Sequence, residues 1–322
     1  MAELRALGRS PLVISPVGLG CWQFSEGQGL GGSYWPALSQ ETANAIVATS
    51  LAGGITWFDT AELYGGGRSE SVLARALTAA GKRNGDVVIA TKWLPWFRTA
   101  ASIRSTIGER CGRLAPFGID LYQVHQPVAL ASTAAQMNAM ADLVEAGRVR
   151  TVGVSNFSAR RMRVAHAALA ARGVPLVANQ VRYSLLDRRI ERNGVLDAAE
   201  ELGVTIIAYS PLAQGVLSGK YHREPGLIRA RPGPRKWMPA FRRRGLEKSR
   251  PLVDALGEVA AGHGVTASAV AMSWLLRSRG DAVVVIPGAT SVAQATENVR
   301  ALDVRLSDDE FRRLEELSRP WR

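Results

Sequence analysis

The 322-residue chain has little cysteine: its two cysteines are Cys21 and Cys111. They provide neither a disulfide framework nor metal-ligand spacing, so we expect no metal site. No apolar run reaches the ~20 residues that a membrane helix needs, and the first residues lack the basic-then-apolar order of a signal peptide. These absences argue against disulfide-scaffold and membrane-spanning classes, and they predict a cytoplasmic protein with no membrane partner.

Acidic residues are scarce relative to basic ones, which gives the chain a formal net charge of +12. Most of the excess lies between Arg223 and Arg250, where ten Lys and Arg residues accompany two acids and leave a net +8. A basic segment on an otherwise balanced body suits a small polyanionic ligand, or simple solvation, better than a nucleic-acid groove. We therefore expect no nucleic-acid partner.

Apolar, β-branched runs alternate with helix-periodic segments along the whole chain, in a globular composition of 47% hydrophobic and 21% charged residues. The predicted strands are Val17–Trp22, Ile55–Asp59, Val87–Lys92, Ile119–His125, Val149–Val154, Leu176–Gln180, Val204–Tyr209 and Ala282–Ile286. The predicted helical units are Gln40–Leu51, Ser69–Ala80, Thr99–Leu114, Ser132–Ala146, Ser158–Ala171, Arg189–Leu202, Arg250–Ala261 with Thr266–Arg277, and Ser291–Ala301. Eight strands alternating with eight helical units predict an α/β fold, a single (β/α)8 TIM barrel over residues 1–322.

Three segments lie outside this count. Leu4–Leu7 and Leu12–Ile14 flank a Gly-Arg-Ser-Pro turn and predict an N-terminal β-hairpin. Ala213–Ser249 follows the seventh strand and is too long for a plain βα connection, so we interpret it as a long loop rich in Gly, Pro and Arg. Ser307–Leu317 opens with a capping-box pattern and predicts a C-terminal helix.

Four polar residues lie where the early strands end. Asp59, Lys92 and His125 each close one predicted strand, and Tyr64 follows Asp59 in the next loop. The carboxyl ends of barrel strands meet at one face, where barrel enzymes place their active sites. An acid, a phenol, an amine and an imidazole gathered there can protonate an oxygen, so the sequence predicts an enzyme.

These residues and the motifs around them resemble the aldo-keto reductase superfamily, in particular its bacterial and potassium-channel β-subunit-like branches. The resemblance is carried by Phe58–Gly65 (FDTAELYG), Ser184–Arg188 (SLLDR) and Tyr209–Gly215 (YSPLAQG), in the family's order along nearly the whole chain. It implies a nicotinamide-dependent oxidoreductase that reduces a small-molecule aldehyde or ketone to an alcohol.

The resemblance implies that Tyr64 is the general acid, and side-chain chemistry supports this role. A free tyrosine titrates near ~10, and an adjacent ammonium lowers that value by favouring the phenolate. Lys92 is the expected ammonium, with Asp59 holding it charged and in position. His125 would donate a hydrogen bond to the substrate oxygen.

The later strands are expected to hold the cofactor. By resemblance, Ser155, Asn156 and Gln180 bind the nicotinamide amide, and Tyr209 stacks on the nicotinamide ring. The pyrophosphate would lie against Ser210, Leu212, Gln214, Gly215, Ser218 and Lys220. Small residues there let backbone N–H groups approach an anion.

The adenosine end departs from the family pattern. Residues Ile286–Ser291, with Gly288 and Thr290, resemble the segment that binds a ribose 2′-phosphate, but many relatives have Lys at position 288 and Arg at position 294. Here these positions hold Gly288 and Gln294, whereas Glu297 and Asn298, which elsewhere meet the adenine, are retained. The expected cofactor is NADPH, and NADH is not excluded.

A 2′-phosphate needs a cation or several N–H donors. We predict that the basic segment after the seventh strand folds over the cofactor and replaces the absent charges. The candidate cations are Arg229, Arg231, Arg235 and Lys236. The alternative is a solvated loop with no role in binding.

The substrate pocket is expected to have aromatic walls. Trp22, Trp93 and Trp96, with Tyr34 or Trp35, come just after early strands, where the family builds such walls. Packing at the barrel rim is the alternative for each of them.

Two other functions remain open at this stage. The first is a sensor or regulatory protein that binds the cofactor with little turnover. The second is a lyase that uses Lys92 as a Schiff base, which requires a lowered lysine pKa. A closed barrel has no free sheet edge to pair, so we predict no assembly through strand addition, and a monomer is the default.

Overall fold

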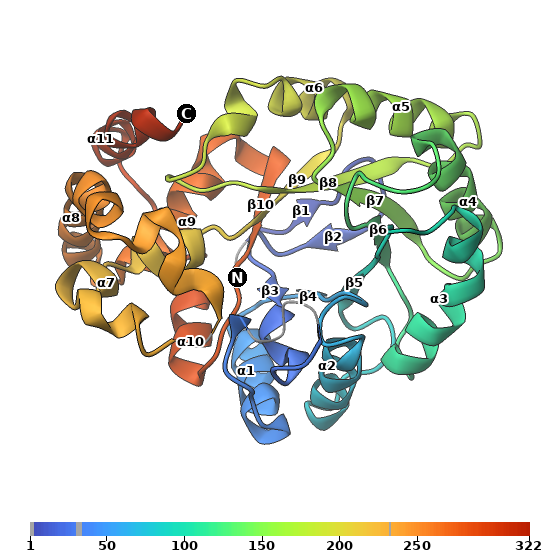
Figure 1. Cartoon of the computed structure of the whole chain (residues 1–322), viewed down its shortest axis with the longest axis horizontal. Helices are drawn as coiled ribbons and strands as arrows, with labels where there is room; N and C mark the ends of the chain where they lie inside the picture. The colour runs from blue at the N-terminus through green and yellow to red at the C-terminus, as the bar shows by residue number, and fades with distance from the viewer. Residues whose placement is uncertain (1–2, 30–33, 232) are drawn as a thin grey trace.

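The computed structural model describes residues 3–29, 34–231 and 233–322, and it forms a nearly closed parallel barrel (Figure 1). The hydrogen-bonded strand order is β10-β9-β8-β7-β6-β5-β4-β3, with every neighbouring pair parallel. Isolated parallel bridges between Val17 and Val285 and between Gly20 and Gly288 join the first strand to the last. The predicted (β/α)8 barrel is confirmed.

The elements alternate as strand and helix through the chain. The strands are β1 (Arg5–Ala6), β2 (Val13–Ile14), β3 (Leu19–Gly20), β4 (Trp57–Asp59), β5 (Val88–Trp93), β6 (Leu121–Val124), β7 (Thr151–Ser155), β8 (Leu176–Arg182), β9 (Thr205–Tyr209) and β10 (Val283–Ile286). The α-helices are α1 (Gln40–Ala52), α2 (Arg68–Ala79), α3 (Ala101–Leu114), α4 (Thr133–Glu145), α5 (Ala159–Ala170), α6 (Val195–Leu202), α7 (Lys220–Arg223), α8 (Arg243–His263), α9 (Ala267–Ser278), α10 (Val292–Arg300) and α11 (Asp308–Ser318).

The predicted N-terminal hairpin is confirmed and closes the floor of the barrel. β1 and β2 pair antiparallel, and Leu7, Leu12 and Ile14 pack against inward-facing strand residues that include Trp57 and Ile207. Figure 1 looks along the barrel, and the hairpin lies within the ring of strands. The hairpin removes the apolar bottom of the barrel from water, which leaves the opposite end of the strands to carry the site.

Two predicted elements begin or end differently. The first barrel strand covers only Leu19–Gly20, because Trp22 already lies in a 3-10 turn, η1 (Trp22–Ser25). The helix predicted from Arg189 starts at Val195, because Gly194 has a left-handed φ of 78° that separates α6 from the short turn η3 (Arg189–Glu191).

The segment after β9 is not a solvated loop. Short helical turns fill it: η4 (Ala213–Ser218), α7, η5 (Pro225–Ile228), η6 (Pro234–Trp237) and η7 (Pro239–Phe241). Val216, Tyr221, Ile228, Phe241 and Leu246 form a small separate core beneath them. The helix predicted to start at Arg250 begins at Arg243 and continues through Pro251, a residue that more commonly marks a helix start.

Among the described residues, no single helix is both long and apolar enough to span a membrane, although α8 and α9 pass that test together as a pair bent by 95°.

Gly18 is a packing requirement of the barrel floor, and its substitution provides a test of the fold. A Cβ at this position would lie 2.3 Å from the ring of buried Trp57, whereas a Cβ on Gly257 in α8 would meet nothing within 4 Å. We predict that Gly18→Ala lowers the free energy of unfolding by about 1–3 kcal/mol through overpacking. The matched Gly257→Ala should raise it by up to about 1 kcal/mol through helix propensity. Urea denaturation of both variants measures the difference, and equal effects at the two positions would contradict this packing.

Candidate active site

The four predicted polar residues come together at the carboxyl end of the barrel. Lys92 is fully buried, and its Nζ lies 2.5 Å from Asp59 Oδ2, 2.8 Å from the Thr60 carbonyl oxygen and 3.3 Å from Tyr64 Oη. The rings of Tyr64 and His125 meet edge to face with centroids 5.7 Å apart. A buried ion pair thus lies directly beneath a phenol that faces an imidazole.

Asp59 is the hub of this cluster. Its Oδ2 accepts from Lys92, and its Oδ1 accepts from Gln180 Nε2 at 2.8 Å and from Gln123 Nε2 at 3.2 Å. Gln123 was missed in the sequence, although a glutamine inside the apolar run Leu121–Val124 was a signal that could have revealed it. The two amides fill the hydrogen-bonding capacity of a carboxylate that has 1% of its surface exposed.

The expectation from the sequence that Lys92 lowers the Tyr64 pKa is wrong for this structure. Burial raises the pKa of Tyr64 well above its usual value, and the negative charge of Asp59 acts in the same direction. Burial also lowers the pKa of Lys92, while the charge of Asp59 opposes that change. Because the Lys92 charge is balanced by Asp59 at shorter range, it does not make Tyr64 acidic here. The phenol keeps its proton at neutral pH.

His125 is held as a neutral imidazole. Burial lowers its pKa well below the usual value, and the positive charge of Lys92 adds to the shift. Its Nδ1 has no hydrogen-bond partner among the described residues. A neutral ring beside Tyr64 can donate one hydrogen bond from a ring nitrogen, but it brings no charge to the site at pH 7.

A second ionic network fixes the loop that carries Tyr64. Glu62 accepts from the Leu94 backbone N–H at 3.1 Å and from Arg110 Nη1 at 2.8 Å, and it also pairs with Arg98. Arg110 Nε lies 3.3 Å from Glu70, whose pKa burial raises to about 7. These contacts join the segment after β4 to the segment after β5. Glu62 is a second residue that sequence reasoning missed.

Three residues predicted to hold an amide surround the catalytic cluster. Ser155 Oγ donates to the Gln180 carbonyl oxygen at 2.9 Å, and Tyr209 Oη donates to Asn156 Oδ1 at 3.0 Å. Asn156 has a left-handed φ of 61°, which turns the chain as β7 ends. The side-chain Nε2 of Gln180 donates to Asp59. The side-chain Oε1 is therefore the Gln180 atom that can accept from a bound amide.

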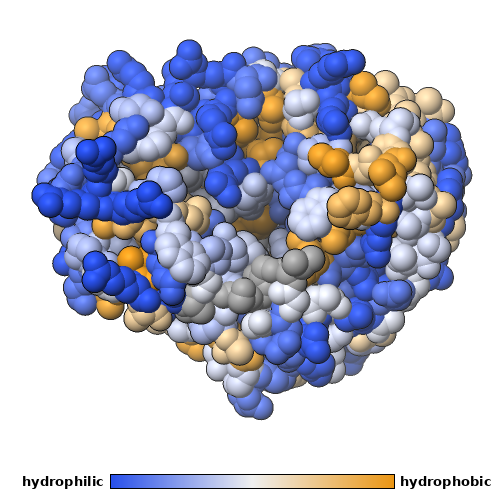
Figure 2. Space-filling model, viewed as in Figure 1, coloured by the Kyte–Doolittle hydropathy of each residue, from blue (hydrophilic) through white to orange (hydrophobic). Residues whose placement is uncertain are grey.

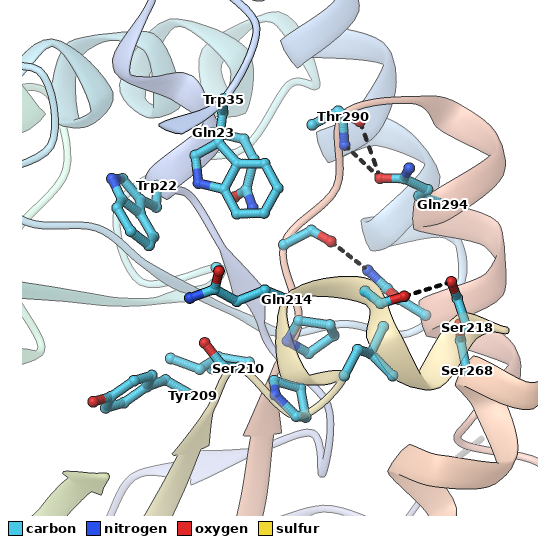
Figure 3. A pocket seen from close by; sticks show the side chains of 18 of the residues that line it. Trp22, Gln23, Trp35, Tyr209, Ser210, Gln214, Ser218, Ser268, Thr290 and Gln294 are labelled. Carbon is cyan, nitrogen blue, oxygen red and sulfur yellow. Dashed lines mark hydrogen bonds between the residues drawn. The ribbon is translucent and has the colours of Figure 1, made fainter. Parts of the chain in front are cut away.

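A cavity of about 980 Å³ runs from this cluster to the N-terminus of α10. Outside the basic segment, the residues predicted to bind the cofactor all line it: Ser155, Asn156, Gln180, Tyr209, Ser210, Leu212, Gln214, Gly215, Ser218, Lys220, Gly288, Thr290, Gln294, Glu297 and Asn298. Figure 3 shows side chains from the first strand's loop, the β9 turn and α10 around the same space. Figure 2 shows its mouth as a hollow on this face of the molecule.

The turn after β9 bends so that backbone and small residues face the cavity. Ser210, Ala213 and Gln214 have left-handed φ values of 51°, 47° and 57°, and Gly215 has a φ of 100°. Non-glycine residues are uncommon in this region of φ, and they concentrate at ligand-binding turns. A run of such residues is the local geometry that builds an anion-binding concavity from N–H groups.

At the adenosine end, a glutamine side chain occupies the space beside Gly288. A Cβ on Gly288 would lie 2.2 Å from the amide of Gln23, which fills that space. The Gln294 Oε1 atom accepts from the Thr290 backbone N–H at 2.8 Å and from its Oγ1 at 3.1 Å (Figure 3). Neutral amides therefore occupy the two positions where the resemblance led us to look for a Lys and an Arg.

Several residues that line the cavity carry a buried polar atom with no partner in the described part of the chain. These atoms are Gln23 Oε1, Trp35 Nε1, Gln214 Oε1 and Arg235 Nε. Leaving such atoms unpaired costs about 1–3 kcal/mol each, which a polar ligand would relieve. An elongated cavity with unpaired polar atoms and an anion-type turn fits a dinucleotide cofactor.

The basic segment brings part of its charge to the cavity. Arg231 and Arg235 line it together with Lys220, and burial and these two arginines lower the pKa of Lys220. Arg229 and Lys236 are not among the lining residues, and the Lys236 ammonium lies 4.9 Å from the Trp237 ring centroid. Two of the four predicted cations, Arg231 and Arg235, therefore line the cavity, and Arg223 of the same segment lines it as well.

The aromatic walls are partly as predicted. Trp22, Tyr34, Trp35 and Trp96 line the cavity, and the Trp22 ring lies 5.9 Å from that of Tyr64. Trp93 is a correction: it is fully buried in the barrel core, where its indole N–H donates to Ser102 Oγ at 3.1 Å. Trp93 is the last residue of β5, and its side chain points between strand and helices rather than into the mouth.

Known proteins agree with this geometry. The Aldo/keto reductase family model matches residues 16–319. An uncharacterized oxidoreductase of Mycobacterium bovis is 38% identical over 312 residues, 96% of this chain and 91% of that protein. The chloroplastic pyridoxal reductase of Arabidopsis thaliana is 34% identical over 320 residues, 95% of this chain and 83% of that protein.

A solved structure extends the match to three dimensions. The glycerol dehydrogenase of Gluconobacter oxydans has a TM-score of 0.84 and 25% identity, and the match covers 98% of this chain and 94% of that one. Fold, site geometry and sequence match therefore agree: the chain is an oxidoreductase-type barrel that belongs to the Aldo/keto reductase family.

Proposed function

We propose that the protein is an NADPH-dependent reductase of aldehydes or ketones with Tyr64 as its proton donor. The observation that carries the proposal is the Lys92 ammonium, which contacts both Asp59 and the Tyr64 phenol at the end of a dinucleotide-sized cavity. Relatives named as a reductase and a dehydrogenase on the same fold support a redox reaction of carbonyl and alcohol groups.

The residues divide the chemistry among them. The chemistry that a reduced nicotinamide would supply, if held in this cavity, is the hydride for the carbonyl carbon. Tyr64 Oη gives its proton to the carbonyl oxygen, and the alcohol forms. The Lys92 ammonium stabilises the phenolate left behind, and Asp59 keeps that ammonium charged although it is buried. Neutral His125 orients the carbonyl oxygen by a hydrogen bond.

Cofactor placement follows from the cavity lining. Ser155, Asn156 and Gln180 would hold the carboxamide, and Tyr209 would stack on the nicotinamide ring beside Tyr64. Lys220, Arg231 and Arg235 would receive phosphate groups, because three cations converging on one part of a cavity repel each other until an anion binds. Burial lowers the Lys92 pKa, as a Schiff-base lysine requires, but Lys92 has none of its surface exposed and is paired with Asp59, which disfavours attack on a substrate carbonyl.

The first prediction concerns the acid. Tyr64→Phe should lower kcat for reduction of 4-nitrobenzaldehyde by about 10²–10⁴-fold, the usual loss when positioned acid catalysis is removed. The phenylalanine keeps the ring that packs against Trp22, so the Kd for NADPH should stay within about twofold. Steady-state kinetics and fluorescence titration measure the two quantities. Near-normal kcat would remove Tyr64 from the role, and a wild type with no turnover would favour a cofactor sensor.

The second prediction concerns the buried ion pair. Lys92→Met should be nearly inactive and should move the alkaline limb of any residual rate to higher pH, because the negative charge of Asp59, which raises the Tyr64 pKa, is then no longer balanced by a cation. It also leaves Asp59 buried without a partner, which destabilises by about 3–5 kcal/mol. The double variant Asp59→Asn with Lys92→Met removes both charges and should recover much of that stability without recovering activity. A pH profile unchanged in Lys92→Met would contradict the coupling to Tyr64.

The third prediction concerns cofactor preference. Arg231→Ala should raise the Kd for NADPH by about tenfold and leave the Kd for NADH nearly unchanged, because a lost charged hydrogen bond is worth about 1.5–3 kcal/mol. Arg229→Ala is the matched control outside the cavity lining and should change neither. High salt should narrow the NADPH preference of the parent protein. A parent that prefers NADH, or an Arg229 effect as large as that of Arg231, would show that this segment does not bind the 2′-phosphate.

A further inference from the structure

Two loops at the mouth of the cavity are built entirely from apolar residues where they turn. Leu94–Phe97 (LPWF) follows β5 and Pro127–Ala131 (PVALA) follows His125 after β6. Loops run over the surface and are usually polar, so nine apolar residues in two adjacent turns need a reason. We call these two segments the apolar lip.

The lip holds much of the exposed apolar surface of the described chain. Of nine large hydrophobic side chains that are exposed there, four belong to it: Trp96 at 40%, Phe97 at 90%, Val128 at 66% and Leu130 at 68%. Phe97 also has a left-handed φ of 57°, a conformation that costs a phenylalanine free energy. The exposed Phe97 ring buries little apolar surface that could offset the cost of this backbone conformation. This indicates that the ring contacts a partner outside the chain.

The two loops are fixed side by side. The Leu130 backbone N–H donates to the Arg98 carbonyl oxygen at 3.0 Å, and Arg98 pairs with buried Glu62 in the loop that carries Tyr64. On the space-filling view, orange side chains gather at one side of the hollow, on the side of α3 and α4 (Figure 2). The lip therefore has a defined position relative to the catalytic phenol.

The lip is continuous with the catalytic cavity. Trp96 is both an exposed lip residue and a wall of the cavity, and His125 and Gln126, directly before Pro127, line the same cavity. Within the two segments no side chain carries a charge. A chain of methylenes attached to a carbonyl at Tyr64 would thus leave the cavity along apolar surface rather than into water.

We propose that the apolar lip binds the hydrocarbon tail of the carbonyl substrate, so that the enzyme prefers long-chain aldehydes over short ones. This inference rests on the proposed reductase function and names its substrate class. A second copy of the chain is a weaker occupant, because a stable dimer buries roughly 800 Å² on each partner, more than four side chains expose.

The test is the dependence of kcat/KM on chain length, measured with butanal, hexanal, octanal and decanal at saturating NADPH. Moving one methylene fully from water to an apolar surface raises kcat/KM by roughly fourfold. On an open lip we expect about half of that binding free energy for each methylene. The decanal-to-butanal ratio should therefore exceed about tenfold. The double variant Phe97→Ser with Leu130→Ser should reduce this ratio by about tenfold, mainly through KM.

Two controls separate apolar area from folding and from general surface effects. Phe97→Leu with Leu130→Met keeps apolar side chains and should retain the ratio. Val164→Ser removes an apolar side chain that is 44% exposed on α5, outside the two lip segments, and should also retain the ratio.

The outcomes separate the two proposals. Aldehyde reduction with no dependence on chain length, or a ratio unchanged in the Ser double variant, overturns the lip as a substrate site. A dimer in sedimentation that dissociates in this variant also overturns it, and assigns the lip to contact between copies. No reduction of any aldehyde by the parent protein overturns the reductase function itself.

Discussion

The buried pair of Asp59 and Lys92 is the constraint on which the rest of the site depends. Two charges without exposed surface are costly to bury, and they persist only because every remaining hydrogen-bonding position is filled by Gln123, Gln180 and the Thr60 carbonyl. Those partners come from two strands, β6 and β8, and from the loop after β4, so the pair requires the barrel to be closed in this register. Above the pair, burial keeps Tyr64 protonated and His125 neutral, and the charges of Asp59 and Lys92 shift the two pKa values in the same directions.

Charge is distributed unevenly along the cavity. At one end a neutralised ion pair leaves almost no net charge under the phenol, which suits a reaction that moves a hydride and a proton onto a neutral carbonyl. The other end of the cavity is positively charged, with Lys220, Arg231 and Arg235. Of the charged groups that shift the Lys220 pKa, Glu297 is the acidic one. A ligand with an anionic end and an uncharged reactive end would bind in one direction only.

Much of this could be predicted from the sequence, because strand ends in a parallel barrel converge wherever the strands are. Asp59, Lys92 and His125 were located by that argument alone. Trp93 was misplaced because strand β5 continues one residue further than predicted, and a one-residue shift exchanges the pocket side of a strand for the core side. Glu62 and Gln23 act through contacts with distant segments, and no local pattern reveals such contacts. The short helical turns between β9 and α8 could not be predicted from the sequence, because they are stabilised by packing on a small core of their own.

The contact between Gln23 and Gly288 lies at the seam where the barrel closes. β3 has only two residues, and two isolated bridges join it to the β10 side, one of them at Gly288 itself. Fewer ladder hydrogen bonds hold this junction than hold the seven-residue β8 to its neighbours. A molecule bound between Gln23 and the N-terminus of α10 touches both sides of the seam at once. Such a molecule would connect the first barrel strand to the last, so that its binding would add to the stability of the closed barrel.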